Sequence, residues 1–184
     1  APYDLFLSAD QIRPILLEDS GKAVSGSRFT YAEGRLVLWI RNSSHIDNMN
    51  LQRSLHDPDL KKLAIANPEL APYGAAARQY LLHLGIWNNL SKKIVLGENI
   101  GQVFALIATG NVDIALLSKS QVLINNKYVK GNFFIIPPEN YQPILQDAIL
   151  LKYGAKNKVA KDFLLFLRSQ SARKTIKFFG YEAP

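Results

Sequence analysis

The 184-residue sequence predicts an α/β fold. Short apolar stretches of strand length alternate along the chain with longer stretches of helix length, which favours layers of helices on sheets. Apolar stretches such as Leu63–Ala66 show no polar alternation, and this is typical of strands covered on both faces. Hydrophobic residues make up 48% of the chain, enough for a packed core. From this alternation we expect mostly parallel sheets.

The first part of the chain opens with a strand and a helix. Tyr3–Ser8 is an apolar run of strand length, and the Asp10–Asp19 stretch begins with a residue that can cap a helix. Two further strands, Arg28–Tyr31 and Arg35–Ile40, are separated by a turn that ends in a glycine. A short helix is then expected to end before the pair Asp57-Pro58.

The middle of the chain gives the clearest alternation. Strands are expected at Lys62–Ala66, Lys93–Leu96 and Val112–Leu117. The helix Pro72–Leu84 has proline in its first turn and a glycine after its end, and the helix Ile100–Ala108 lies between an asparagine cap and a glycine stop. Each of these helices follows one strand and precedes the next.

The last part contains strands at Gly131–Ile136 and Ala148–Lys152, followed by helices at about Lys158–Leu167 and Ser171–Phe179. A glycine ends the second helix. We expect the pair Phe178-Phe179 to lie in the core.

The charge and the cysteine content limit the kinds of partner and binding site that the chain can have. The formal net charge of +7 favours anionic partners, but the basic residues are scattered and no basic block interleaved with aromatics occurs, so nucleic acid is not an expected partner. Cysteine is absent, which excludes disulfides and thiolate sites. No apolar run approaches the roughly 20 residues of a membrane span. Because the chain opens inside an expected strand, we expect Ala1 to mark a cut or boundary and an N-terminal segment to be missing.

No catalytic or metal set is recognisable. The histidines His45, His56 and His83 do not have metal-ligand spacing, and His83 is expected at the surface. Motifs of the types GxSxG, P-loop and GxGxxG are absent from the sequence. We therefore expect no enzyme, no catalytic residue, no cofactor and no bound metal cation.

Two helix starts are better candidates for a binding site. Each follows a strand, and each presents a backbone N–H, from Tyr73 after Pro72 and from Ile100 after Asn99. Small residues from Gly74 onward let a ligand or neighbouring backbone approach closely. The N–H groups and the dipole of a helix start suit an anion, although most helix starts bind only water or a side chain.

At these residues the chain resembles a known family. The segments IANPELAPYGAAARQYLLHLGIW, IVLGENIGQVFALIATGNVDIA, IIPPENYQPILQDAILLKYG and FLLFLRSQSARKTIKFFGYEAP, with APYDLFLSAD at the start, resemble the periplasmic molybdate-binding proteins of ABC importers. The resemblance implies a type II periplasmic-binding-protein-like fold with two α/β lobes. It places residues 40–123 in lobe II and residues 1–39 plus 124–184 in an incomplete lobe I.

The resemblance also implies a ligand and its contacts. The ligand is molybdate or tungstate, held in a cleft by neutral hydrogen bonds and delivered to the permease of an ABC transporter. The backbone donors of the family fall on Tyr73 and Ile100. A tyrosine hydroxyl of some members is replaced by Ser118, which is shorter but keeps a hydroxyl. The implied location is periplasmic, or extracytoplasmic and membrane-anchored in a Gram-positive organism.

Other readings stay open. The same fold could bind another oxyanion or an organic anion, or serve as the ligand-sensing domain of a transcriptional regulator. An enzyme on a similar scaffold is less favoured because the catalytic set is missing. Since the resemblance implies that lobe I lacks strands, we expect the chain to self-associate or to retain its missing piece.

Overall fold

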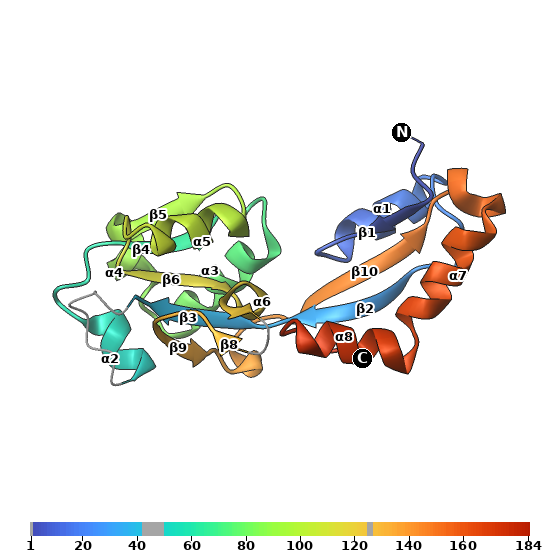
Figure 1. Ribbon diagram of the computed structural model, residues 1–184. Helices are drawn as coiled ribbons and strands as arrows, with labels where there is room; N and C mark the ends of the chain where they lie inside the picture. Colours follow the sequence, from blue (N-terminus) through green and yellow to red (C-terminus); the bar gives the residue numbers. More distant parts are fainter. Residues whose placement is uncertain (1, 42–49, 125–126) are drawn as a thin grey trace. The chain divides into compact units, whose positions relative to one another are not determined.

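The computed structural model describes residues 2–41, 50–124 and 127–184, and it separates into two compact units (Figure 1). Unit 1 comprises Ala1–Gly34 and Ile144–Pro184, and unit 2 comprises Arg35–Pro143. The division expected from the sequence was 1–39 with 124–184 against 40–123. The observed boundaries differ because residues 36–40 and 132–135 pair within the sheet of unit 2.

Unit 1 is built from both ends of the chain. Its elements are β1 (Leu5–Leu7), α1 (Ile12–Asp19), β2 (Phe29–Gly34), β10 (Ile144–Leu150), η3 (Tyr153–Lys156), α7 (Lys158–Leu167) and α8 (Gln170–Phe178). The three strands form an antiparallel sheet in the order β1-β10-β2, so the C-terminal strand lies between two N-terminal ones.

One face of the unit 1 sheet carries its apolar core. Ala148 and Leu150 alternate along β10 and pack against Ala160 and Leu164 of α7. The side chain of Asn157 caps α7 by accepting hydrogen bonds from the first turn, which fixes where this amphipathic helix begins.

Unit 2 is a continuous piece of chain. Its elements are β3 (Leu36–Ile40), α2 (Leu51–His56), β4 (Leu63–Ala66), α3 (Pro72–His83), α4 (Trp87–Leu90), η1 (Ser91–Lys93), β5 (Ile94–Gly97), α5 (Ile100–Ala108), β6 (Ile114–Ser118), α6 (Lys119–Val122), β7 (Leu123–Ile124), β8 (Lys127–Tyr128), β9 (Asn132–Ile135) and η2 (Pro138–Asn140). A five-stranded sheet has the order β5-β4-β6-β3-β9, and β7 pairs with β8 separately.

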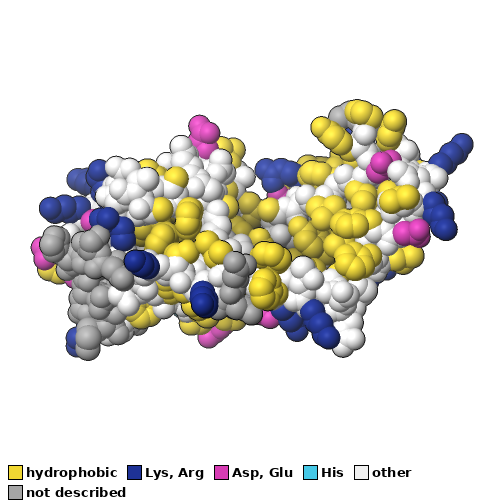
Figure 2. Space-filling view, in the orientation of Figure 1, with side chains coloured by type: hydrophobic (Ala, Val, Ile, Leu, Met, Phe, Trp, Pro, Cys, Tyr) yellow, Lys and Arg dark blue, Asp and Glu magenta, His cyan; other side chains and the backbone are white. Residues whose placement is uncertain are grey.

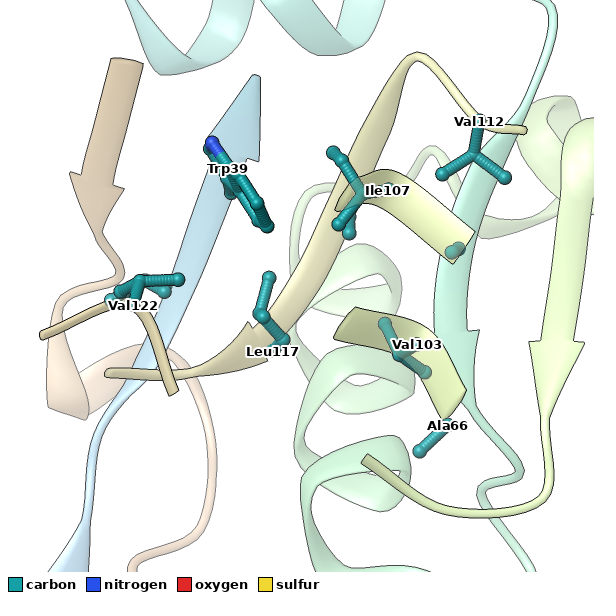
Figure 3. Packing of buried hydrophobic residues seen from close by; sticks show 10 residues of the cluster. Trp39, Ala66, Val103, Ile107, Val112, Leu117 and Val122 are labelled. Atoms are coloured by element: carbon teal, nitrogen blue, oxygen red, sulfur yellow. The ribbon is translucent and has the colours of Figure 1, made fainter. Parts of the chain in front are cut away.

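Helices cover both faces of the five-stranded sheet. On one face, Trp39, Leu117 and neighbouring strand residues pack against Val103 and Ile107 of α5 (Figure 3). The alternate strand residues, such as Leu38 and Leu116, are also fully buried, and α3 contacts β3, β4 and β6. Since successive side chains of a strand point to opposite faces, α3 covers the face opposite to α5.

Several expectations are confirmed and others are wrong. The bounds of α5 and α7 are those predicted, and the α/β class holds. The expectation of mostly parallel sheets is wrong, because among the described strands only β4–β5 and β4–β6 pair in parallel. Phe178 and Phe179 are 41% and 51% exposed and are not core residues.

Within the described part of the chain, no helix combines the length and the apolar character that a membrane span requires.

Candidate functional site

Three neighbouring parallel strands of unit 2 end at the same edge of the sheet. β4 lies between β5 and β6 and is parallel to both. The carboxyl ends of β5, β4 and β6 therefore lead into α5, α3 and α6 from one edge. In open α/β sheets ligands bind beside this edge, where the strand order reverses. The strand order does reverse at β4, because the chain passes from β4 to β5 on one side and then to β6 on the other.

The turn from β4 to α3 is organised by Asn67. Its backbone N–H donates to the carbonyl oxygen of Gly97 at 2.7 Å, which joins the end of β4 to the end of β5. Its side-chain oxygen accepts from the N–H of Glu69 at 3.0 Å, and its carbonyl accepts from Ala71 at 2.9 Å. These bonds close the turn and direct the chain into the first residues of α3.

Glycine is required in the first turn of α3. A β-carbon at Gly74 would lie 2.2 Å from the carbonyl oxygen of Ala66, and real β-carbons do not approach backbone so closely. The first turn of α3 thus rests directly on the end of β4. This contact sets the position of Tyr73, which is buried and whose N–H belongs to the positive end of the helix dipole.

The turn from β5 to α5 is capped by two side chains. Asn99 accepts from the N–H of Gln102 at 3.0 Å, and the side chain of Gln102 accepts from the N–H of Glu98 at 2.6 Å. Ile100 is the first residue of α5, and no acidic residue lies in its first turn. Among residues 2–41, 50–124 and 127–184, none accepts a hydrogen bond from the N–H of Ile100. We regard that donor as a candidate contact for a ligand at the sheet edge.

Ser118 occupies the end of the third strand. It is 2% exposed, and its hydroxyl oxygen caps α6 by accepting from the N–H of Ser120 at 3.2 Å. The two hydroxyl oxygens of Ser118 and Ser120 are 2.6 Å apart. The hydroxyl of Ser118 thus sits in a short hydrogen-bonded chain beside the same edge.

The three residues predicted from the sequence lie at or after the carboxyl ends of three adjacent strands. Tyr73, Ile100 and Ser118 contribute two helix-start N–H groups and one hydroxyl, and none of these groups carries a formal charge. Backbone N–H groups can only donate hydrogen bonds, so the arrangement suits an acceptor that carries negative charge.

A groove of about 370 Å³ lies among the β4–α3 turn, α3, α4 and β5. It is lined by Asn67, Pro68, Glu69, Arg78, Trp87, Ser91, Ile94 and Leu96. The guanidinium of Arg78 is paired with Glu69 at 3.3 Å and lies 5.6 Å from the centre of the Trp87 ring. Because its one arginine already has partners and most of its lining is apolar, this groove is a poorer anion site than the three strand ends.

A buried polar cluster in unit 1 was missed from the sequence. Asp147 is fully buried and accepts from Arg28 at 2.5 Å, from Thr30 at 2.6 Å and from Gln11 at 3.1 Å. The hydrogen bond to Asp147 raises the pKa of Arg28 above its usual value. The only sequence signal for this cluster was the polar pair Gln146-Asp147 within an apolar stretch. Such a pair is typical of the end of a strand, so the cluster was not predicted. The cluster ties β10 to β2 and to the start of α1.

Nearby, burial raises the pKa of Tyr31 to about 12, with smaller contributions from Tyr181 and Asp147. The hydroxyl of Tyr31 donates toward the side-chain oxygen of Gln146 at 3.2 Å. The cluster is therefore satisfied by groups of unit 1 itself.

Metal-ligating residues do not gather in the part of the chain that the structure covers. No group of three or more His, Cys, Asp or Glu side chains in that part could hold a metal ion. His83 is exposed, as predicted, and His45 lies outside the described residues.

Comparison with known proteins identifies the family of the chain. Residues 1–182 match the family described as "Bacterial extracellular solute-binding protein". The chain is 41% identical over 181 residues to the molybdate-binding protein ModA of Rhodobacter capsulatus, and the match covers 98% of this chain and 69% of that protein.

Solved structures agree with the sequence match. The periplasmic molybdate-binding protein of Azotobacter vinelandii has a TM-score of 0.90 and 35% identity, with 100% of this chain and 80% of that chain covered. The substrate-binding domain of a putative molybdenum ABC transporter from Clostridium difficile has a TM-score of 0.77 and 27% identity, with 100% and 78% covered. The predicted α/β, periplasmic-binding-protein-like fold is therefore confirmed.

Proposed function

The chain belongs to the family of bacterial extracellular solute-binding proteins, and on this basis we propose that it captures molybdate or tungstate for an ABC importer. The proposed contacts in unit 2 are the backbone N–H groups of Tyr73 and Ile100 and the hydroxyl of Ser118. No cofactor is required, since the oxyanion is the cargo.

One observation carries this proposal. Two helix starts and one hydroxyl lie at or after the carboxyl ends of three adjacent parallel strands, and the 2.7 Å hydrogen bond from Asn67 to Gly97 ties two of these turns together. Each helix start favours an anion by about 0.3–1 kcal/mol through its dipole, before any direct hydrogen bond. A neutral set of fixed donors can hold a dianion without the side-chain entropy cost of ordering lysines.

Selectivity would follow from the same donors. A fully ionised tetrahedral dianion offers an acceptor to each N–H, whereas a phosphate that keeps a proton would turn one donor toward another. Sulfate is also fully ionised but smaller, so it would meet fixed donors at longer distances. We therefore expect molybdate and tungstate to bind more tightly than sulfate or phosphate.

The roles of the two units, the protein partner and the place of action are further parts of the proposal. Unit 1 and unit 2 correspond to the two lobes, and the permease of the importer is the protein partner. The place of action is the periplasm or another extracytoplasmic site. Self-association of this chain also belongs to the proposal, because none of the described strands pairs with the outer edge of β1. The role is binding without catalysis, as for the solute-binding proteins that it matches.

An amide-resolved titration tests the proposed contacts. Nitrogen-15 spectra of the 184-residue chain are recorded with molybdate, tungstate, sulfate and phosphate. The expected result is that molybdate and tungstate move the amide signals of Tyr73 and Ile100 most, because an N–H that donates to an anion is deshielded.

A thermal-shift series with the same four anions supplies the second readout, since a ligand that binds only the folded state raises the melting temperature. Equal shifts with sulfate and molybdate would reject the selectivity. Amide changes confined to other residues would reject the site while leaving the family unaffected.

A further inference from the structure

The positive charge of the chain is concentrated in one segment of unit 1. Residues 152–177, from just after β10 to the last turn of α8, contain 8 of the 22 Lys and Arg residues and 1 of the 15 Asp and Glu residues. The formal charge of this segment is therefore +7, equal to that of the whole chain, and the remaining residues carry 14 charges of each sign. The eight basic residues are Lys152, Lys156, Lys158, Lys161, Arg168, Arg173, Lys174 and Lys177.

All eight of these side chains are exposed. None of them forms an ion pair with a carboxylate in the described part of the chain, whereas Arg13 and Arg28, elsewhere in unit 1, do form such pairs. Exposed cations without partners sum to a positive potential over the surface, which attracts anions. The segment is therefore a basic surface made of η3, α7 and α8.

Three of the cations project from one side of α8. The spacing of Arg173, Lys174 and Lys177 places them on the same side of the helix, and that of Ala172 and Ile176 places these two on the opposite side. Ala172 is 3% exposed and Ile176 is half-buried. The helix thus packs on unit 1 through its apolar side and presents its basic side to solvent.

α8 lies beside β2. Arg168, just before α8, lies over the ring of Phe29 in β2 at 4.1 Å. Glu182, just after α8, exchanges two backbone hydrogen bonds with Glu33 of β2, at 2.8 and 2.9 Å. Because β10 separates β2 from β1, α8 lies beside the edge of the sheet opposite to β1 (Figure 1).

Aromatic side chains accompany the basic side of α8. Phe178 and Phe179 end the helix, are 41% and 51% exposed, and pack edge-to-face with their ring centres 5.4 Å apart. Figure 2 shows Lys and Arg side chains projecting from unit 1 beside exposed hydrophobic side chains. Basic residues next to exposed phenyl rings are typical of helices that lie on a membrane surface.

The residue types indicate the kind of anion. Six of the eight cations are lysines, which carry a mobile point charge on a long stem. The carboxylates of a protein partner are better held by arginine, which offers two parallel hydrogen bonds, and lysine is depleted in protein interfaces. Mobile lysine charges suit a diffuse anionic layer such as phospholipid head groups.

We infer that the basic side of α8, together with the cations of η3 and α7, binds an anionic phospholipid surface. The ammonium and guanidinium groups contact lipid phosphates, and Phe178 and Phe179 contact the head-group region. Each cation close to an anionic surface strengthens binding about fivefold. The three cations of α8 should therefore supply about 100-fold in affinity. This inference concerns unit 1 and stands whichever anion unit 2 binds.

Co-sedimentation with lipid vesicles tests the inference. The 184-residue chain is mixed with vesicles of phosphatidylcholine alone and with vesicles that contain about 30% phosphatidylglycerol, a fully anionic lipid. We expect binding only to the anionic vesicles. The binding should weaken at least about tenfold between about 25 and about 150 mM salt, because salt screens exposed charges.

A pair of triple variants tests the location. Replacing Arg173, Lys174 and Lys177 by Gln should weaken vesicle binding about 100-fold, and Gln keeps the helix propensity of α8. The control replaces Lys61, Lys62 and Lys92 by Gln, which removes the same charge from exposed positions of unit 2 and should change binding less than about twofold.

Four outcomes would overturn the inference. They are no binding to anionic vesicles at the lower salt concentration, equal binding to both kinds of vesicle, equal loss in the two triple variants, and loss of binding when the chain is extended at its N-terminus as its gene encodes. The last outcome would show that another segment of the same polypeptide occupies the basic side of α8.

Discussion

The backbone N–H of Asn67 donates to the carbonyl oxygen of Gly97 over 2.7 Å, one residue beyond the end of β4. This bond extends the β4–β5 ladder into the two turns that precede α3 and α5. The N–H groups of Tyr73 and Ile100 therefore sit on turns that are fixed to each other. A change that moves one turn should affect both proposed donors.

Ile100→Pro should remove one proposed donor while keeping its helix. Proline is favourable at the first position of a helix, and Asn99 before it already has φ −147° and ψ 171°, the extended conformation that precedes proline. Losing one hydrogen bond to a charged group costs about 1.5–3 kcal/mol, or roughly 10–150-fold in molybdate affinity. Calorimetric titration measures the affinity. Ile100→Ala keeps the N–H and controls for the lost side chain, and equal losses in both variants would contradict the donor role.

Gly74→Ala should displace the first turn of α3. The added β-carbon would lie 2.2 Å from the carbonyl of Ala66, so backbone must move, at a cost of about 1–3 kcal/mol in unfolding free energy. Molybdate affinity should fall as well, because Tyr73 moves with the turn. Ala75→Gly in the same turn costs about 1 kcal/mol through helix propensity alone and should keep affinity. Urea unfolding and titration of both variants separate the two effects.

Ser118→Ala removes a hydroxyl that caps α6 and is proposed to contact the anion. The lost cap should cost about 1 kcal/mol in stability, and the lost neutral hydrogen bond should weaken molybdate binding about 2–10-fold. Ser120→Ala keeps the hydroxyl of Ser118 and is the control. If molybdate binding is weaker in Ser120→Ala but not in Ser118→Ala, the hydroxyl of Ser120 and not that of Ser118 contacts the anion.

Asp147→Asn should destabilise unit 1. Asp147 is fully buried and paired with Arg28, and breaking a buried ion pair costs about 3–5 kcal/mol. We expect the lower end of this range, because Arg28 also contacts Glu18 at 3.4 Å. Urea unfolding measures the change. Asp19→Asn, at an exposed position, should have little effect, and equal stability of the two variants would show that the buried charge is dispensable.

Tyr80 should make unfolding free energy sensitive to alkaline pH. Burial raises its pKa from 10.0 to about 12 in the folded chain, because the buried site disfavours the phenolate. The neutral form is favoured by folding, so this contribution is complete below pH 10 and is lost as pH rises from 10 through 12. The slope is at most about 1.4 kcal/mol per pH unit for one residue. Tyr80→Phe should flatten the stability curve over that window, and parallel curves for the two proteins would refute the assignment.

Local signals predicted the elements that carry the candidate site. The bounds of α5 and α7 follow from an asparagine cap at each start, and the glycine after α5 adopts φ 81°, which favours glycine. The position of Tyr73 follows from the proline that begins α3, and that of Ile100 follows from the asparagine cap. The sequence signals do not show that Tyr73 and Ile100 share one edge of the sheet. That conclusion needs the order of the strands, which is set by contacts between distant parts of the chain.

Where the prediction failed, the cause was also long-range. The predicted strand began at Ala148, because the polar residues Gln146 and Asp147 were interpreted as exposed. The observed strand β10 begins at Ile144. They are buried through partners such as Tyr31 and Arg28, which lie 115 and 119 residues away along the chain. The prediction of mostly parallel strands failed for the same reason. β3 follows β2 after one residue, yet it lies in unit 2 and pairs antiparallel with β6 there.

The placement of β10 between β1 and β2 sets an order for folding during synthesis. Unit 2 is one uninterrupted segment and can collapse as soon as it leaves the ribosome. Unit 1 must wait for its central strand, and contacts such as that from Asn157 to Asp4 close a loop of 153 residues. Such distant contacts form slowly because loop closure precedes the gain from packing. Until then β1 and β2 stay without the strand that joins them, and this interval is when a chaperone or an exporter would meet them.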